Sequence, residues 1–128
     1  MSDHVLVLST VAQPQDAERI ARELVERRLA ACVNVVAGLT SFYRWKGAVQ
    51  RDDERLLLIK TRRDRYAALE QALVALHPYE LPEIVALPFE AGSAPYLAWI
   101  DESVGASRPT AARARGPRSS PRNPRSRR

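Results

Sequence analysis

Residues 5–8 read VLVL, an uninterrupted apolar run with the length of a β-strand. Two similar runs follow, LLLI at residues 56–59 and IVAL at residues 84–87. Successive residues of a strand point to opposite faces of a sheet, so these runs predict strands that are apolar on both faces. We therefore expect a sheet that needs an apolar cover on each side.

Helical periodicity appears in the segments between these strands. In residues 16–29, apolar side chains recur along one face, and oppositely charged residues four positions apart occupy the other face. The apolar pattern returns from residue 66, and Pro78 ends it because a proline disfavours helical geometry at His77. Ser93 is a suitable N-cap for a short last helix through Val104.

The remaining strands form a hairpin and an edge. Residues 32–36 and 39–45 have strand character on either side of Gly38, which predicts a bulge or bend between them. A turn is expected at residues 46–48, where Gly47 tolerates the positive φ that a tight turn requires. The strand expected at residues 83–89 contains Pro88, which favours an edge position or a bulge.

The element order predicts an α+β fold, a ferredoxin-like split βαβ sandwich with a short C-terminal helix. Its two main helices would cover one face of the sheet. The apolar second face would be too large to leave in water, so we expect a second copy of the chain to cover it, giving a homo-oligomer. The alternative is that the third helix or the hairpin folds over this face.

Charge divides the chain into two parts. Its 128 residues have a formal net charge of +5, with 45% hydrophobic and 27% charged residues. Residues 105–128 contain eight arginines and no acid, so residues 1–104, the expected folded domain, are slightly acidic. The tail is rich in Arg, Pro and Ser, and we expect it to be disordered. It is either a passive extension or a weak, salt-sensitive attachment to nucleic acid or anionic lipid.

Several classes of protein lack their characteristic residues. One cysteine excludes an intrachain disulfide, and no segment predicts a secretory signal or a membrane span, so we expect a cytoplasmic protein. The glycines form no dinucleotide or phosphate-binding motif, and neither a nucleophile elbow nor a metalloprotease motif is present. The aliphatic central strands also differ from the stacking aromatics of RNA-recognition modules. We expect a protein that is not an enzyme.

Five separated segments carry a resemblance to a known family. They are LAACVNVV from Leu29, SFYRWKG from Ser41, LLLIKT from Leu56, HPYELPEI from His77 and YLAWI from Tyr96. Together they resemble the CutA family, also called divalent ion tolerance or CutA1-like proteins, over roughly residues 4–104. The resemblance implies a trimer assembled through the sheets, a cytoplasmic location, tolerance of divalent metals such as copper, and no established catalytic activity. The similar trimer of the PII signalling proteins makes ligand sensing an alternative function.

Two residues are candidate metal ligands, because copper and zinc favour imidazole and thiolate donors. His77 matches the position where the relatives carry a proposed ligand, but other donors of the relatives correspond to Ser9 and Leu76 in this chain. We therefore expect copper or another divalent cation to be held weakly. His77 is alternatively a helix-terminal residue, and Cys32 is alternatively a buried structural thiol.

A second group of residues could line a cleft between subunits. Tyr43, Arg44 and Trp45 are of the types that concentrate binding energy at interfaces, and subunit packing is their simpler role. The cleft would add the following residues: Lys60, Tyr79, Glu80 and Glu83. The stiff Pro82 separates the two glutamates, which could then act as a hydrolytic pair, bind a hard cation, or pair with a base of a neighbouring subunit.

Overall fold

The computed structural model describes residues 3–105 of the chain. The elements follow one another as β1 (His4–Val11), α1 (Pro14–Glu26), β2 (Cys32–Trp45), β3 (Ala48–Arg62), the 3₁₀ turn η1 (Arg63–Arg65), α2 (Tyr66–Leu76), β4 (Val85–Pro88) and α3 (Ala94–Val104). The predicted α+β class and short last helix are confirmed. From Ala106 onward, the predicted disordered tail lies outside the described residues.

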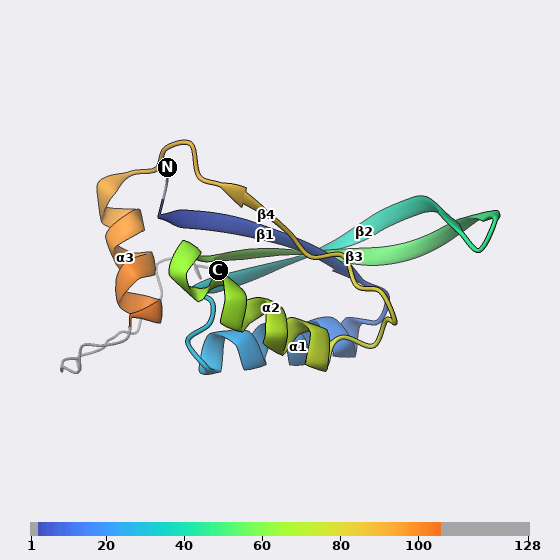
Figure 1. The fold of residues 1–128 in the computed structure, drawn as a ribbon, viewed down its shortest axis with the longest axis horizontal. Coiled ribbons are helices and arrows are strands. Elements are labelled where there is room, and N and C mark those ends of the chain that lie inside the picture. Colours follow the sequence, from blue (N-terminus) through green and yellow to red (C-terminus); the bar gives the residue numbers. More distant parts are fainter. Residues whose placement is uncertain (1–2, 106–128) are drawn as a thin grey trace.

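One antiparallel sheet organises the protein, with the strand order β2-β3-β1-β4. This is the order of the split βαβ arrangement. Helices α1 and α2 lie side by side against one face of the sheet, and α3 lies at one end of it (Figure 1). The far part of the β2–β3 hairpin extends beyond the two helices as a long two-stranded arm (Figure 1).

The core lies between the sheet and the first two helices. Val7 of β1 is the register partner of Ile59 of β3, and both are fully buried. Ile20 of α1 and Leu73 of α2 are also fully buried in the same cluster. Burying each such side chain contributes about 1.5–3 kcal/mol, so this layer supplies most of the apolar stabilisation.

The other face of the sheet is apolar and incompletely covered. Leu6 and Leu8 alternate with the buried valines of β1, and they pair with Leu87 and Val85 of β4. Val85 remains 47% exposed and Leu87 44% exposed. Neither α3 nor the hairpin covers these two residues. The sequence-based expectation of an apolar second face is therefore confirmed for one protomer.

Element boundaries differ from the predictions where local backbone geometry decides them. The first helix spans Pro14–Glu26 rather than residues 16–29, because Pro14 begins it and Arg28 has a φ of 60°, which is not helical. The two predicted strands around Gly38 are one strand, β2. Its register shifts between Val36 and Leu39, where Gly38 has a φ of 85°. The last strand covers Val85–Pro88 rather than residues 83–89.

Candidate functional site

His77 is held by the backbone on both sides of its ring. It follows α2 with extended geometry, as Pro78 predicts. Its Nε2 lies 2.8 Å from the Thr10 carbonyl oxygen, and its Nδ1 accepts the Tyr79 N–H at 3.1 Å. These contacts require a neutral ring that donates from Nε2 and accepts at Nδ1. Burial lowers the pKa of His77, which favours the same neutral form.

This arrangement leaves His77 without a free nitrogen lone pair. A metal ion binds imidazole through an unprotonated nitrogen, and the only unprotonated nitrogen here already accepts a backbone hydrogen bond. The side chain is also 7% exposed. The structure therefore supports the structural role that the sequence left open for His77.

Tyr79 and Glu54 form a partly buried pair that sequence reasoning missed. The Tyr79 hydroxyl donates to Oε2 of Glu54 at 2.5 Å, and Glu54 is 6% exposed. Burial, followed by this hydrogen bond to Glu54, raises the pKa of Tyr79 well above its usual value. Glu54 follows two acidic residues on β3, and nothing in that run distinguishes it from a solvated acid.

The aromatic residues of the hairpin occupy the projecting arm. Tyr43 donates to Asp52 across the strand pair, and this hydrogen bond raises the pKa of Tyr43. Trp45 adjoins the turn, where the Lys46 ammonium lies 5.8 Å from the centre of its indole ring. Arg44 is exposed on the same strand. Within one protomer these residues line no cleft with Lys60.

Lys60 instead belongs to a small polar group on the uncovered sheet face. Its Nζ donates to Oδ1 of Asn34 at 2.6 Å. The Cys32 thiol lies 3.7 Å from the same oxygen, and Cys32 and Lys60 are register partners on β2 and β3. The sequence analysis selected Cys32 and Lys60 for separate sites, and the structure brings them together.

Glu80 and Glu83 remain exposed in the loop before β4. Of the ion pairs among residues 3–105, none includes either glutamate. The predicted pairing with Lys60 or Arg44 is therefore not made within one protomer. A partner from a second copy stays a prediction.

The two candidate metal ligands do not share a site. Cys32 begins β2 and is paired with Lys60, which is in turn paired with Leu6 near the start of β1. His77 instead contacts Thr10, near the end of β1. Among residues 3–105, no three His, Cys, Asp or Glu side chains are grouped so that they could hold a metal ion. The donors of a single protomer therefore do not fit a divalent transition metal, which usually needs several nitrogen or sulfur ligands.

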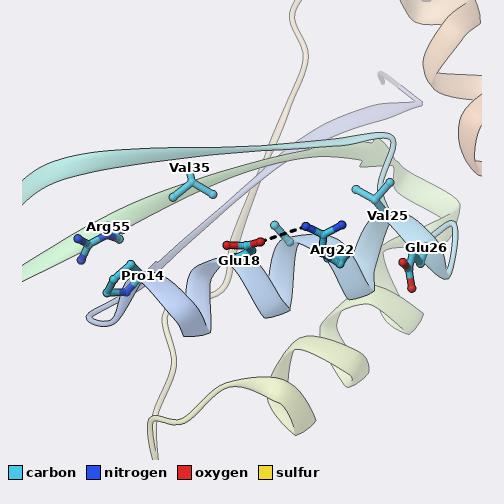
Figure 2. Close-up of a pocket in the computed structure, with 8 residues that line it drawn as sticks. Pro14, Glu18, Arg22, Val25, Glu26, Val35 and Arg55 are labelled. Atoms are coloured by element: carbon cyan, nitrogen blue, oxygen red, sulfur yellow. Dashed lines mark hydrogen bonds and ion pairs between the residues drawn. The ribbon is translucent and has the colours of Figure 1, made fainter. Parts of the chain in front are cut away.

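The pocket in Figure 2 is an open groove between α1 and β2. It has a volume of about 560 Å³ and is lined by apolar residues such as Val25 and Val35. An ion pair between Glu18 and Arg22, 3.0 Å long, lies along it. None of the predicted site residues lines this groove, so it adds no chemistry to them.

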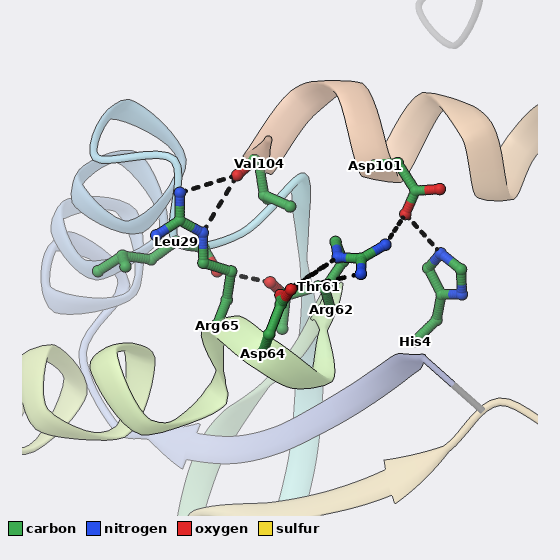
Figure 3. Close-up of polar contacts among 8 residues, drawn as sticks. All are labelled: His4, Leu29, Thr61, Arg62, Asp64, Arg65, Asp101 and Val104. Carbon is green, nitrogen blue, oxygen red and sulfur yellow. Dashed lines mark hydrogen bonds and ion pairs between the residues drawn. The ribbon is translucent and has the colours of Figure 1, made fainter. Parts of the chain in front are cut away.

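A polar network that the sequence did not predict fixes α3 to the sheet (Figure 3). Oδ1 of Asp101 lies 2.8 Å from Nε2 of His4 and 2.5 Å from the Arg62 guanidinium. Partial burial acts to raise the pKa of Asp101, but the hydrogen bonds from Arg62 and His4 outweigh it and lower that pKa. At the end of the helix, Arg65 donates twice to the Val104 carbonyl, at 2.9 and 3.1 Å.

Comparison with known proteins identifies close relatives. A family model described as CutA1 divalent ion tolerance protein matches residues 5–103. A divalent-cation tolerance protein CutA of Thermus thermophilus is 53% identical over 100 residues, which cover 78% of this chain and 97% of the relative. A CutA homolog of Xenopus laevis is 50% identical over 96 residues, covering 73% of this chain and 64% of the relative.

Solved structures of similar proteins share the fold. The divalent cation tolerance protein of Thermus thermophilus superimposes with a TM-score of 0.78 at 52% identity, covering 80% of this chain and 99% of that chain. CutA of Xylella fastidiosa superimposes with a TM-score of 0.79 at 43% identity, covering 81% and 100%. The fold of the described residues is thus that of solved CutA proteins.

The names of other relatives correct the predicted location. A protein of Arabidopsis thaliana, 42% identical over 99 residues, which are 77% of this chain and 54% of the relative, is named chloroplastic. A structure from Archaeoglobus fulgidus is named a periplasmic divalent cation tolerance protein. It has a TM-score of 0.77 at 38% identity and covers 80% of this chain and 99% of that one. These names contradict the cytoplasmic prediction, which rested on the single cysteine, on the lack of a predicted signal or membrane span, and on the family resemblance. No helix in residues 3–105 has the length and apolar character needed to cross a membrane.

Proposed function

The chain belongs to the CutA1 divalent ion tolerance family, and from this premise we propose that it acts in divalent-cation tolerance as a non-enzymatic homotrimer. The observation that carries the proposal is the uncovered apolar face of the sheet. Leu6, Leu8, Val85 and Leu87 lie together on that face through their register. Soluble monomers rarely leave such a continuous apolar surface in water, which supports assembly through the sheets.

The cation, of the copper type, is held weakly and by more than one protomer. Cys32 and His77 are too far apart in the fold to ligate one ion together, and His77 already uses both ring nitrogens. Three-fold assembly brings three copies of any residue near the axis together, which supplies donors that one protomer lacks. Exposed Glu80 and Glu83 are available to such an interface.

Native mass spectrometry of the full chain tests the assembly and the cation separately. We expect a particle of three 14.3 kDa chains that gains Cu²⁺ or Zn²⁺ when either ion is added and releases it to EDTA. A monomeric particle would contradict the trimer. A trimer that takes up neither ion would contradict the cation role but leave the assembly standing.

Two matched variants test which side chains bind the cation. One is the double variant Glu80→Gln/Glu83→Gln, which changes the exposed loop, and the other is His77→Gln, which changes the buried ring. We expect the glutamate variant to lower uptake of the ion, because it removes exposed carboxylates, which are among the ligands that zinc accepts in proteins. His77→Gln should leave uptake unchanged, since its ring already bonds to Thr10 and Tyr79. Loss of cation uptake in His77→Gln alone would show instead that the His77 imidazole is a ligand.

A further inference from the structure

Three polar side chains form an island on the uncovered face, next to the apolar Leu6 and Leu58. Cys32 and Asn34 of β2 lie beside Lys60 of β3, and Lys60 is in register with both Cys32 and Leu6. The intervening Ile59 and Val7 point to the helices and are fully buried, so Lys60 points to the opposite face. All three polar residues are partly buried.

The hydrogen bonds within this island occupy its side-chain acceptor, the amide oxygen of Asn34. Oδ1 of Asn34 receives the Lys60 ammonium at 2.6 Å and lies 3.7 Å from the Cys32 thiol. The groups that remain are donors, namely two N–H bonds of the ammonium and the amide NH₂ of Asn34. Of the ion pairs among residues 3–105, none includes Lys60.

The island therefore has the charge and hydrogen bonding of an anion site rather than a cation site. A divalent cation at Cys32 would be repelled by the Lys60 ammonium, which binds the same amide oxygen as the thiol. Covering this face without a counter-charge would impose a desolvation cost on the ammonium. An oxyanion with two neighbouring oxygens removes that cost, because one oxygen can bind the ammonium and the other the amide.

We propose that Lys60, Asn34 and Cys32 form a binding site for a small oxyanion, a carboxylate or a phosphate. Each site is built within one protomer and goes beyond the proposed cation tolerance. Because β2 is an edge strand, Cys32 and Asn34 border the rim of the sheet, where a small anion can enter even when a second copy covers the centre. This position favours a free ligand over a carboxylate of a neighbouring subunit.

The chain has only two lysines, Lys46 and Lys60, which makes the site directly observable. Full-length protein containing lysine labelled with ¹³C at the ε carbon should give two ε-CH₂ signals, assigned with Lys60→Met and Lys46→Met. We expect acetate or phosphate, added at constant ionic strength and with EDTA present, to shift the Lys60 signal saturably. Lys46 at the hairpin turn is the internal control and should not follow. The separate titrations identify whether carboxylate or phosphate is preferred.

Asn34→Leu should weaken the binding of the preferred anion about tenfold, because it removes a hydrogen-bond donor to a charged group. A shift that is linear, equal for chloride, or equal at Lys46 would overturn the proposal. A Lys60 signal that no anion moves would also overturn it. If Lys60→Met then dissociates the oligomer, a carboxylate of a neighbouring copy occupies the site instead.

The single cysteine provides a second measurement that does not depend on labelling lysine. The rate at which iodoacetamide alkylates Cys32 should fall several-fold when the preferred anion saturates the site, since the thiol lies beside the same amide oxygen as Lys60. Lys46→Met should retain this protection and Lys60→Met should lose it. Equal protection in both variants would contradict the site. EDTA in every sample keeps the result independent of the proposed cation.

Discussion

At the scale of single residues, His77 shows how one histidine can be placed from the sequence while its role stays open. The sequence locates it at the end of a helix, because Pro78 follows. Its partners, Thr10 and Tyr79, decide the role, and Thr10 is 67 residues away. Such a contact depends on how the loop after α2 packs on β1, which local patterns do not encode. The same holds for the pair of Tyr79 with Glu54.

Stability should fall with decreasing pH through His77. Burial lowers its pKa below the usual 6.5, outweighing Thr10, Asp16 and Glu54, which act to raise it. The unfolded chain therefore binds a proton more readily than the folded one. The contribution is fully present above pH 6.5 and is lost as the pH falls from there through the folded pKa.

Urea unfolding at about pH 7.5 and about pH 5.5, on either side of the ordinary histidine pKa, measures this effect. Wild type should lose more free energy of unfolding between the two values than His77→Gln, which has no titrating ring at this position. The rest of the chain is the same in both proteins, so the difference between them isolates position 77. Equal losses in the two proteins would show that His77 is not responsible.

At the scale of elements, the sequence predicts the helices and strands well and their joints less well. Apolar periodicity places both main helices, and Pro78 ends the second of them correctly. The bulge at Gly38 is confirmed, but the strand continues through it, because the partner strand β3 keeps both halves paired. A long-range partner overrides the local break, and the pattern of β2 alone does not contain that information.

Gly38→Ala should lower the free energy of unfolding by roughly 1–2 kcal/mol, the usual cost of a left-handed conformation for a residue with a Cβ. The added Cβ would meet no atom within 4 Å, so the loss would come from the backbone alone.

Lys46→Asn is expected to have the opposite effect on stability. Lys46 has a φ of 52° next to Gly47, and Asn-Gly suits this turn better, so stability should rise slightly. Urea unfolding checks both, and a neutral Gly38→Ala would refute the backbone explanation.

At the scale of the whole molecule, the uncovered sheet face is the feature that the sequence predicts most directly. Three strands that are apolar at consecutive positions predict this face. The register places Leu8 between Leu58 and Val85 at the centre of the face. The polar island around Lys60 is less visible, because Cys32 and Lys60 are far apart in the sequence and meet only through strand pairing.

Leu8→Lys should separate the protomers, because it puts a charge in the middle of the proposed interface. Size-exclusion chromatography with light scattering should then report a 14.3 kDa particle, with the far-UV circular dichroism retained. Val74→Lys is the matched control, since Val74 is 53% exposed on α2. An assembly that survives Leu8→Lys but not Val74→Lys would place the contact on the helices instead.

The position of β1 has a consequence for biosynthesis. This strand is central in the sheet but pairs only with Arg55–Arg62 and Val85–Pro88, far downstream. A ribosome adds about 5–20 residues per second, so the nascent VLVL segment waits for several seconds before its last partner emerges. During that interval the unpaired VLVL segment is exposed, and we expect it to be bound by chaperones that recognise short aliphatic segments.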